Sequence, residues 1–94
     1  MRKTIKANAE FPVGSIATDK TILRQAIQAE LDAINQYEQF AANVKNKKIR
    51  EVLLDIAREE KVHVGELTEL LNTFDDEHEE AVKEGEKEAR KEIS

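Results

Sequence analysis

The sequence lacks cysteine and tryptophan, and its 94 residues include only three Gly, three Phe and one Pro. The absence of cysteine excludes disulfide bonds, thiolate nucleophiles and Cys-ligated zinc or iron–sulfur sites. Charged residues make up 37% and apolar residues 39% of the chain, which is typical of helices with charged surfaces and not of a sheet-rich fold. We therefore expect one small all-α domain, because the length leaves no room for a second one.

Long apolar runs and excess positive charge are also missing. No run approaches the ~18 residues of a membrane span, and the N-terminal residues do not form the apolar stretch of a secretory signal. The net charge of −5 arises in residues 75–94, which hold nine acidic and four basic side chains. We expect a soluble, cytoplasmic protein with no membrane partner and, without a basic footprint, no nucleic-acid partner. The acidic tail is interpreted as a solvated face.

Apolar side chains recur at helical spacing in two consecutive segments, residues 19–44 and 49–74. In the second segment a stripe alternates strictly in steps of four and three residues, through Ile49, Leu53, Ile56, Glu60, His63, Leu67, Leu70 and Phe74. The polar stretch 45–48 separates the two segments, so the sequence predicts an antiparallel helical hairpin over residues 19–74. Residues 1–18 are predicted to form an irregular arm, because they have no helical period. Residues 75–94 are predicted to form an acidic helix or tail, with a helix over about 76–92 that Asp76 and Glu79 cap.

Polar residues interrupt the apolar seam of this hairpin at one level. If the turn is centred near residue 45, two residues lie at the same level on the two helices when their numbers sum to about 90. This rule places Glu30 opposite Glu60 and Ile27 opposite His63. At ~1.5 Å per residue this layer lies ~22 Å from the turn, with apolar residues on both sides. The spacing Glu60-x-x-His63 puts a carboxylate and an imidazole on the same helix face.

This polar layer predicts a metal centre shared by two chains. A hairpin of ~55 residues has a small core and an uncovered apolar stripe, so we expect a two-fold homodimer that forms a four-helix bundle. The dimer brings together four carboxylates and two imidazoles, which are costly to bury without a cation. Two Glu and two Glu-x-x-His motifs are the ligand set of di-iron carboxylate bundles. We predict two iron ions per dimer with Glu30, Glu60 and His63 as ligands; manganese, zinc or calcium can substitute.

The segments that carry these residues resemble a known family. AELDAINQYEQF, with Glu30 and Tyr37, and LLDIAREEKVHVGEL, with Glu60 and His63, resemble the encapsulated ferritins, half-length ferritin-like proteins associated with encapsulin nanocompartments. The resemblance covers roughly residues 20–74. It implies a ferroxidase that oxidises Fe(II) with dioxygen or peroxide, dimers assembled into a ring-like decamer, and iron storage inside an encapsulin shell. It also implies catalytic roles for Glu30, Glu60, His63 and Tyr37, with Tyr37 beside the ligands.

The sequence departs from the family pattern in two places. Some members carry extra acidic residues for iron uptake beside the first ligand, where this chain has Ala29 and Asp32, so only Asp32 could serve. The C-terminal residues 90–94 do not resemble an encapsulin-targeting peptide. The chain is therefore either a domain cut from a shell fusion or a full-length protein that reaches the shell by another route.

Two other functions stay open at this point. One is a rubrerythrin-like peroxidase, which would need a separate electron donor because this chain has no cysteine for a rubredoxin iron. The other is a non-catalytic helical assembly module in which the Glu and His layer binds a structural metal or sets the helix register. Glu59 and His78 are interpreted as surface residues.

Overall fold

The structure is a computed structural model that describes the backbone of residues 16–94 and the side chains from residue 19 onward. This part of the chain consists of three α-helices and contains no strand: α1 (Ile16–Asn43), α2 (Lys47–Phe74) and α3 (Asp76–Ile93). The prediction of an all-α fold is therefore confirmed. None of these helices is long and apolar enough to cross a membrane.

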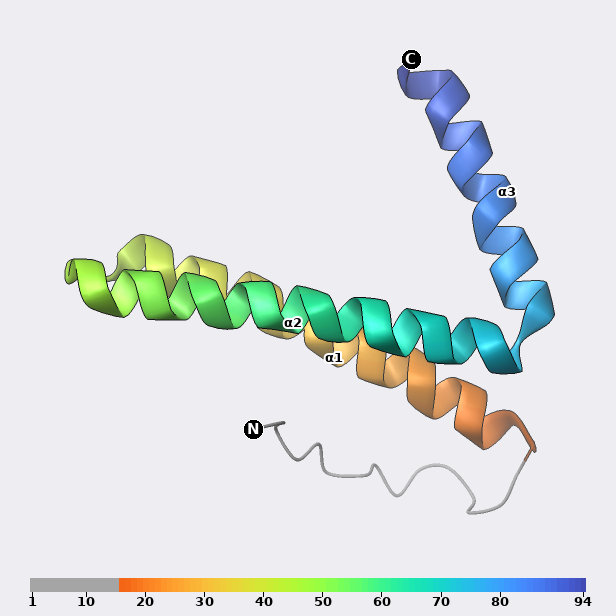
Figure 1. Ribbon diagram of the computed structural model, residues 1–94, viewed down its shortest axis with the longest axis horizontal. Helices are drawn as coiled ribbons and strands as arrows, with labels where there is room; N and C mark the ends of the chain where they lie inside the picture. The colour runs from red at the N-terminus through yellow and green to blue at the C-terminus, as the bar shows by residue number, and fades with distance from the viewer. Residues whose placement is uncertain (1–15) are drawn as a thin grey trace.

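Helices α1 and α2 lie side by side as an antiparallel hairpin (Figure 1). Asn46 caps the start of α2, because its side-chain oxygen accepts a hydrogen bond from the backbone N–H of Ile49 at 3.0 Å. Arg50 closes the end of α1, where its guanidinium donates to the carbonyl oxygens of Ala41 at 3.2 Å and Val44 at 2.8 Å. The connection thus spans residues 44–46, and its centre is where the sequence predicts it.

Three helix boundaries differ from the sequence-based expectation. Helix α1 begins at Ile16, three residues before the expected start at Asp19, and residues 1–15 of the predicted arm lie outside the described part of the chain. Helix α2 begins at Lys47 and not at Ile49, because the Asn46 cap lets the polar residues join the helix. The cap of α3 is Asp75, not Asp76, because Asp75 has a non-helical backbone, with φ −146° and ψ 84°, and its side chain accepts a hydrogen bond from His78 N–H at 3.1 Å.

The contact between α1 and α2 is narrow. Its buried apolar side chains are those of Ile34, Ala41, Ala57 and Leu71. Three positions of the predicted α2 stripe, Ile49, Leu70 and Phe74, are instead exposed, and Phe74 is 66% accessible. A strict alternation of four and three residues drifts by ~20° per heptad around a straight helix, so the ends of the stripe rotate away from α1. The hairpin therefore leaves an apolar face open.

Large apolar side chains continue along this hairpin on both helices. Those that stay exposed are Ile22, Leu31, Phe40, Ile49, Val52, Leu54, Val62, Leu70 and Phe74. A soluble monomer rarely leaves so many large apolar side chains uncovered on a single small domain. The exposed set is large enough to serve as a packing surface.

Helix α3 leaves the end of α2 and projects away from the hairpin (Figure 1). The buried carboxylate of Asp75 holds this junction, because it lies 2.9 Å from the Arg24 guanidinium and 3.8 Å from the Lys20 ammonium of α1. The hydrogen bond from His78 N–H, with help from both cations, lowers the pKa of Asp75 below its ordinary value. We call Asp75, Arg24 and Lys20 the junction cluster. It ties the start of α3 to the opposite helix.

Candidate metal centre

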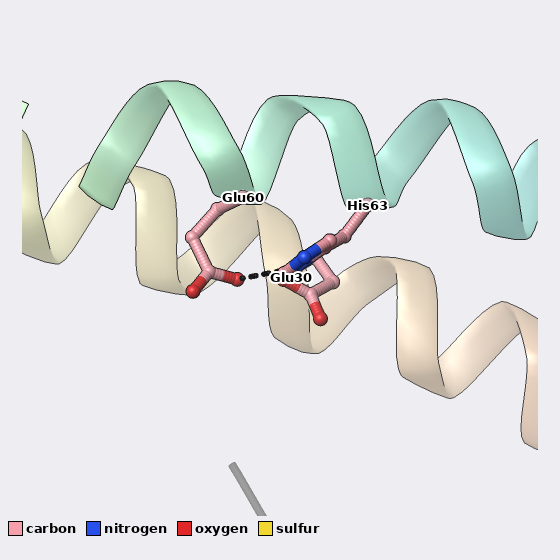
Figure 2. Close-up of side chains that lie close together, drawn as sticks. All are labelled: Glu30, Glu60 and His63. Atoms are coloured by element: carbon pink, nitrogen blue, oxygen red, sulfur yellow. Dashed lines mark ion pairs between the residues drawn. The ribbon is translucent and has the colours of Figure 1, made fainter. Parts of the chain in front are cut away.

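Three potential metal ligands converge between the two helices of the hairpin. Glu30 comes from α1, and Glu60 and His63 come from α2 (Figure 2). Each side chain offers one ligand atom, and these atoms lie within 4.8 Å of one another. In the part of the chain that the structure describes, this is the one such group of carboxylate and imidazole side chains. The level pairing across the hairpin that the sequence predicts is therefore confirmed.

The geometry around the imidazole is that of donors arranged about a common point. His63 Nδ1 lies 3.4 Å from Glu30 Oε2 and 3.6 Å from Glu60 Oε2. Donors held at ~2.1 Å from one metal ion are about 3.0 to 3.4 Å apart in octahedral or tetrahedral geometry. The observed separations are close to this range. Small side-chain shifts would let all three residues bind one ion.

Burial makes this arrangement costly without a cation. The three side chains are 15–22% exposed, and the atoms Glu30 Oε2 and His63 Nδ1 are shielded from solvent without a hydrogen-bond partner. Each unsatisfied buried polar atom costs about 1–3 kcal/mol, and the two carboxylates also repel each other. A divalent cation would give both orphaned atoms a partner and offset the repulsion. The residues present therefore fit a metal ion.

The chemistry of the donors restricts which metal suits the site. Carboxylate oxygen and imidazole nitrogen without thiolate are suited to iron, manganese and zinc, and less to soft ions such as Cu(I). Of these three, zinc has no redox chemistry. The donor set thus allows both a redox centre and a structural one.

Tyr37, the fourth residue predicted to act at the site, lies seven residues beyond Glu30 on α1, or ~10 Å along the helix axis. Its half-buried ring packs edge-on against Phe40, with the ring centroids 6.0 Å apart. A hydrogen bond from its hydroxyl to a ligand carboxylate stays a prediction.

The residues beside the ligands differ in exposure, and Glu59 is exposed, as predicted. Asp32 and Glu59 are exposed, whereas Ala29 is half-buried. Glu59 directly precedes Glu60 on α2, but its side chain is exposed to solvent. A substitution of Glu59 is therefore a matched control for the same substitution of Glu60. Sequence reasoning missed the junction cluster, because Arg24 and Asp75 are 51 residues apart and no local pattern links them.

Comparison with known proteins places this site in a family. A family model described as Rubrerythrin matches residues 21–94, a range that includes Glu30, Tyr37, Glu60 and His63. The chain belongs to the rubrerythrin family. A crystal structure of the encapsulated ferritin domain from Pyrococcus furiosus is similar over 100% of this chain and 95% of that one, with 40% identity and a TM-score of 0.82. The predicted resemblance to encapsulated ferritins is thereby confirmed.

Two curated relatives of this rubrerythrin-family chain carry encapsulin in their names. The Ferritin-like-encapsulin shell fusion protein of Pyrococcus furiosus is 59% identical over 56 residues, which are 60% of this chain and 16% of that protein. Encapsulin nanocompartment cargo protein EncB of Myxococcus xanthus is 34% identical over 64 residues, which are 68% of this chain and 40% of that protein. The chain thus matches less than half the length of either curated relative.

Proposed function

We propose that this protein is a ferroxidase, which oxidises Fe(II) to Fe(III) with dioxygen or peroxide at a two-iron centre shared between two copies of the chain. The observation that carries the proposal is the cluster of Glu30, Glu60 and His63, in which two buried donor atoms face each other without hydrogen-bond partners. Membership of the rubrerythrin family supports an oxidoreductase role. Fe(II) is the substrate as well as the ion that the site holds.

The shared centre follows from the number of ligands and the open apolar face. One chain supplies two carboxylates and one imidazole, which is half of the ligand set of a di-iron carboxylate bundle. A two-fold homodimer doubles this set, and its four carboxylates balance two divalent ions. The exposed apolar side chains of the hairpin supply a surface that such a dimer would bury. The family resemblance extends this to dimers that assemble into a ring-like decamer.

In the reaction the protein residues hold charge and exclude water. Two Fe(II) ions release two electrons, which with two protons reduce one dioxygen to hydrogen peroxide or one peroxide to two waters. Glu30 and Glu60 supply the negative charge that favours Fe(III) over Fe(II), and His63 binds as a neutral nitrogen donor. The apolar residues above and below the layer lower the local dielectric, which strengthens this electrostatic preference.

An encapsulin shell is the proposed partner and location. The relatives named as an encapsulin shell fusion and an encapsulin cargo protein support it, as does the similarity to an encapsulated ferritin domain. In this proposal the chain works inside a nanocompartment in the cytoplasm, and the shell retains the Fe(III) product. The helical assembly itself need not enclose a mineral core.

The test is Fe(II) oxidation in air, followed by ferric absorbance in a stopped-flow instrument. The wild type and Glu59→Ala should oxidise iron rapidly and saturate near about one Fe(II) per chain, as a two-metal site per dimer requires. Glu60→Ala should lose the rapid phase, because it removes one ligand from each half-site. Equal rates for Glu60→Ala and Glu59→Ala would refute the ferroxidase proposal and favour a structural metal site.

A peroxidase is the second candidate, and the rubrerythrin family match favours it. The oxidant distinguishes the two. Mixing with hydrogen peroxide under nitrogen should oxidise Fe(II) much faster than dioxygen does if peroxide removal is the function. A peroxidase would also need an external reductant for turnover, because the chain carries no cysteine for a second iron site.

A further inference from the structure

A single residue connects the two helices that diverge at the end of the hairpin. Helix α2 ends at Phe74 and α3 begins at Asp76, so Asp75, with φ −146° and ψ 84°, is the whole connection. Figure 1 shows that α3 leaves the hairpin at this point in a different direction from α2. The change of direction thus depends on the backbone of one residue.

The local sequence does not require a break between these helices. Residues 66–84 contain neither Gly nor Pro, the two residue types that disfavour a helix most. The Asn, Thr and Asp residues in the range 72–76 disfavour it less. A break is also unfavourable, because the last carbonyl groups of α2 and the first N–H groups of α3 lack partners within a helix. A continuous helix would pair these groups, so other interactions must stabilise the bend.

The carboxylate of Asp75 makes such interactions with both of its oxygen atoms. Its Oδ1 accepts a hydrogen bond from the backbone N–H of His78 at 3.1 Å and lies 3.8 Å from Lys20 Nζ. Its Oδ2 accepts a hydrogen bond from the Arg24 guanidinium at 2.9 Å. The contact with His78 caps α3, and the other two join this cap to α1. The side chain is only 7% exposed, so water competes little for these contacts.

Few other contacts fix the direction of α3. None of its side chains is buried, and among the described helices it packs against α2 alone. The ion pairs of Lys83 with Glu79 and of Arg90 with Glu86 lie within α3, so they do not depend on its direction. The acidic residues of its first turn favour a helix N-terminus at this place, but they set no angle. The direction of α3 therefore depends on the junction cluster.

We propose that the connection between α2 and α3 is a hinge with two states and that the junction cluster holds its bent state. When the cluster is intact, α3 projects from the hairpin as observed. When it is broken, Asp75 adopts helical backbone angles, and α2 continues into α3 as one helix over residues 47–93, ~70 Å long. The two states present Val82 and Ile93, which are exposed on α3, in different directions. This proposal does not depend on the proposed function.

A distance between two spin labels distinguishes the two states, and the chain has no cysteine of its own to interfere with labelling. Lys47→Cys and Lys91→Cys place one label at the start of α2 and one in the last turn of α3, both at exposed positions. A continuous helix would separate them by ~66 Å, whereas the structure is 46 Å along its longest axis. Labelled chains are refolded with a large excess of the same chain without the cysteines, so that the distance within one chain is measured.

The bent state should dominate in the labelled chain and lose population when Asp75 is replaced. We expect one short distance for the chain with labels alone and an added population near ~66 Å for Asp75→Ala, which removes the cap and both ion pairs. Lys20→Gln/Arg24→Gln keeps the cap and should give a smaller long-distance population. Asp76→Ala is the matched control, because it changes the adjacent, exposed aspartate, and it should keep the short distance alone.

A proline at residue 76 gives a test in the reverse direction. Proline fits the first position of a helix, but inside a continuous helix it lacks the N–H and clashes with the preceding turn. Residue 76 is the first residue of α3 in the bent state and an interior residue in the continuous one. The chain that combines Asp75→Ala with Asp76→Pro should therefore lose the long distance and return to the short one.

Three outcomes of these measurements would overturn the proposal. A single short distance for Asp75→Ala would mean that the bend does not need the junction cluster. A broad distribution of distances, with less helix by circular dichroism than the wild type, would mean that α3 melts and does not continue α2. A long distance that survives Asp76→Pro would mean that the labels separate without a continuous helix.

Discussion

Replacing Glu30 with leucine should have opposite effects on stability with and without a metal ion. The Oε2 atom of Glu30 is buried without a hydrogen-bond partner, and it faces the similarly unpaired Nδ1 of His63. Leucine has a similar volume and would pack beside the apolar residues of the seam. Replacement of buried charges by packed apolar groups is often neutral or stabilising.

The size of each effect can be worked from the site. Without metal, Glu30→Leu removes one unsatisfied buried oxygen and the repulsion between two carboxylates, so the free energy of unfolding should rise by about 1–3 kcal/mol. With metal at about 1,000 times its Kd, the wild type should gain about 4.1 kcal/mol at each site. The variant lacks one of the three ligands and should gain much less. The order of stability should therefore reverse.

Urea denaturation followed by circular dichroism measures this reversal at a fixed chain concentration. One series contains EDTA, and the other contains Zn(II), which occupies oxygen and imidazole sites without redox chemistry. Asp32→Leu is the control, because it removes an exposed carboxylate two residues along the same helix. Its stability should stay within about 0.5 kcal/mol of the wild type, and zinc should still stabilise it. Equal stabilisation of the wild type and Glu30→Leu by zinc would refute the assignment of Glu30 as a ligand.

Two further predictions concern the hairpin and its junction with α3. The carboxylate of Asp75 has a lowered pKa, so it stabilises the fold fully above its ordinary pKa of 3.8, and this stabilisation is lost as the pH falls through the lowered value. Asp75→Asn keeps a neutral acceptor for His78 N–H but loses the ion pair to Arg24. Its thermal midpoint should therefore be below that of the wild type at pH 7 and approach the wild-type value in acid. A difference in thermal midpoint that persists in acid would contradict this prediction. Leu71 is 1% exposed, and Leu71→Ala should lower the free energy of unfolding by about 2–5 kcal/mol in a urea titration. A loss of less than about 1 kcal/mol would contradict this prediction and mean that the surrounding side chains relax into the cavity.

The sequence by itself determined the features that depend on near neighbours. Periodicity places two helices and a turn near residue 45, and this turn makes Glu30 level with Glu60, as the structure has it. The reason is that a hairpin with a short connection leaves little freedom of register, so distances along two regular helices can be counted from the turn. The grouping of two carboxylates and an imidazole followed from residue numbers alone. The family resemblance rests on the same residues.

Only the tertiary structure decided the features that depend on contacts between distant residues. The choice of Asp75 over Asp76 as the cap of α3 depends on Arg24, 51 residues away, which pairs with the carboxylate that the turn brings beside it. Local capping rules do not distinguish two adjacent aspartates. The exposure of Ile49, Leu70 and Phe74 likewise depends on how far two straight helices follow one another before their stripes diverge. The sequence pattern marks an apolar stripe, but the packing of α1 on α2 decides which part of it stays exposed.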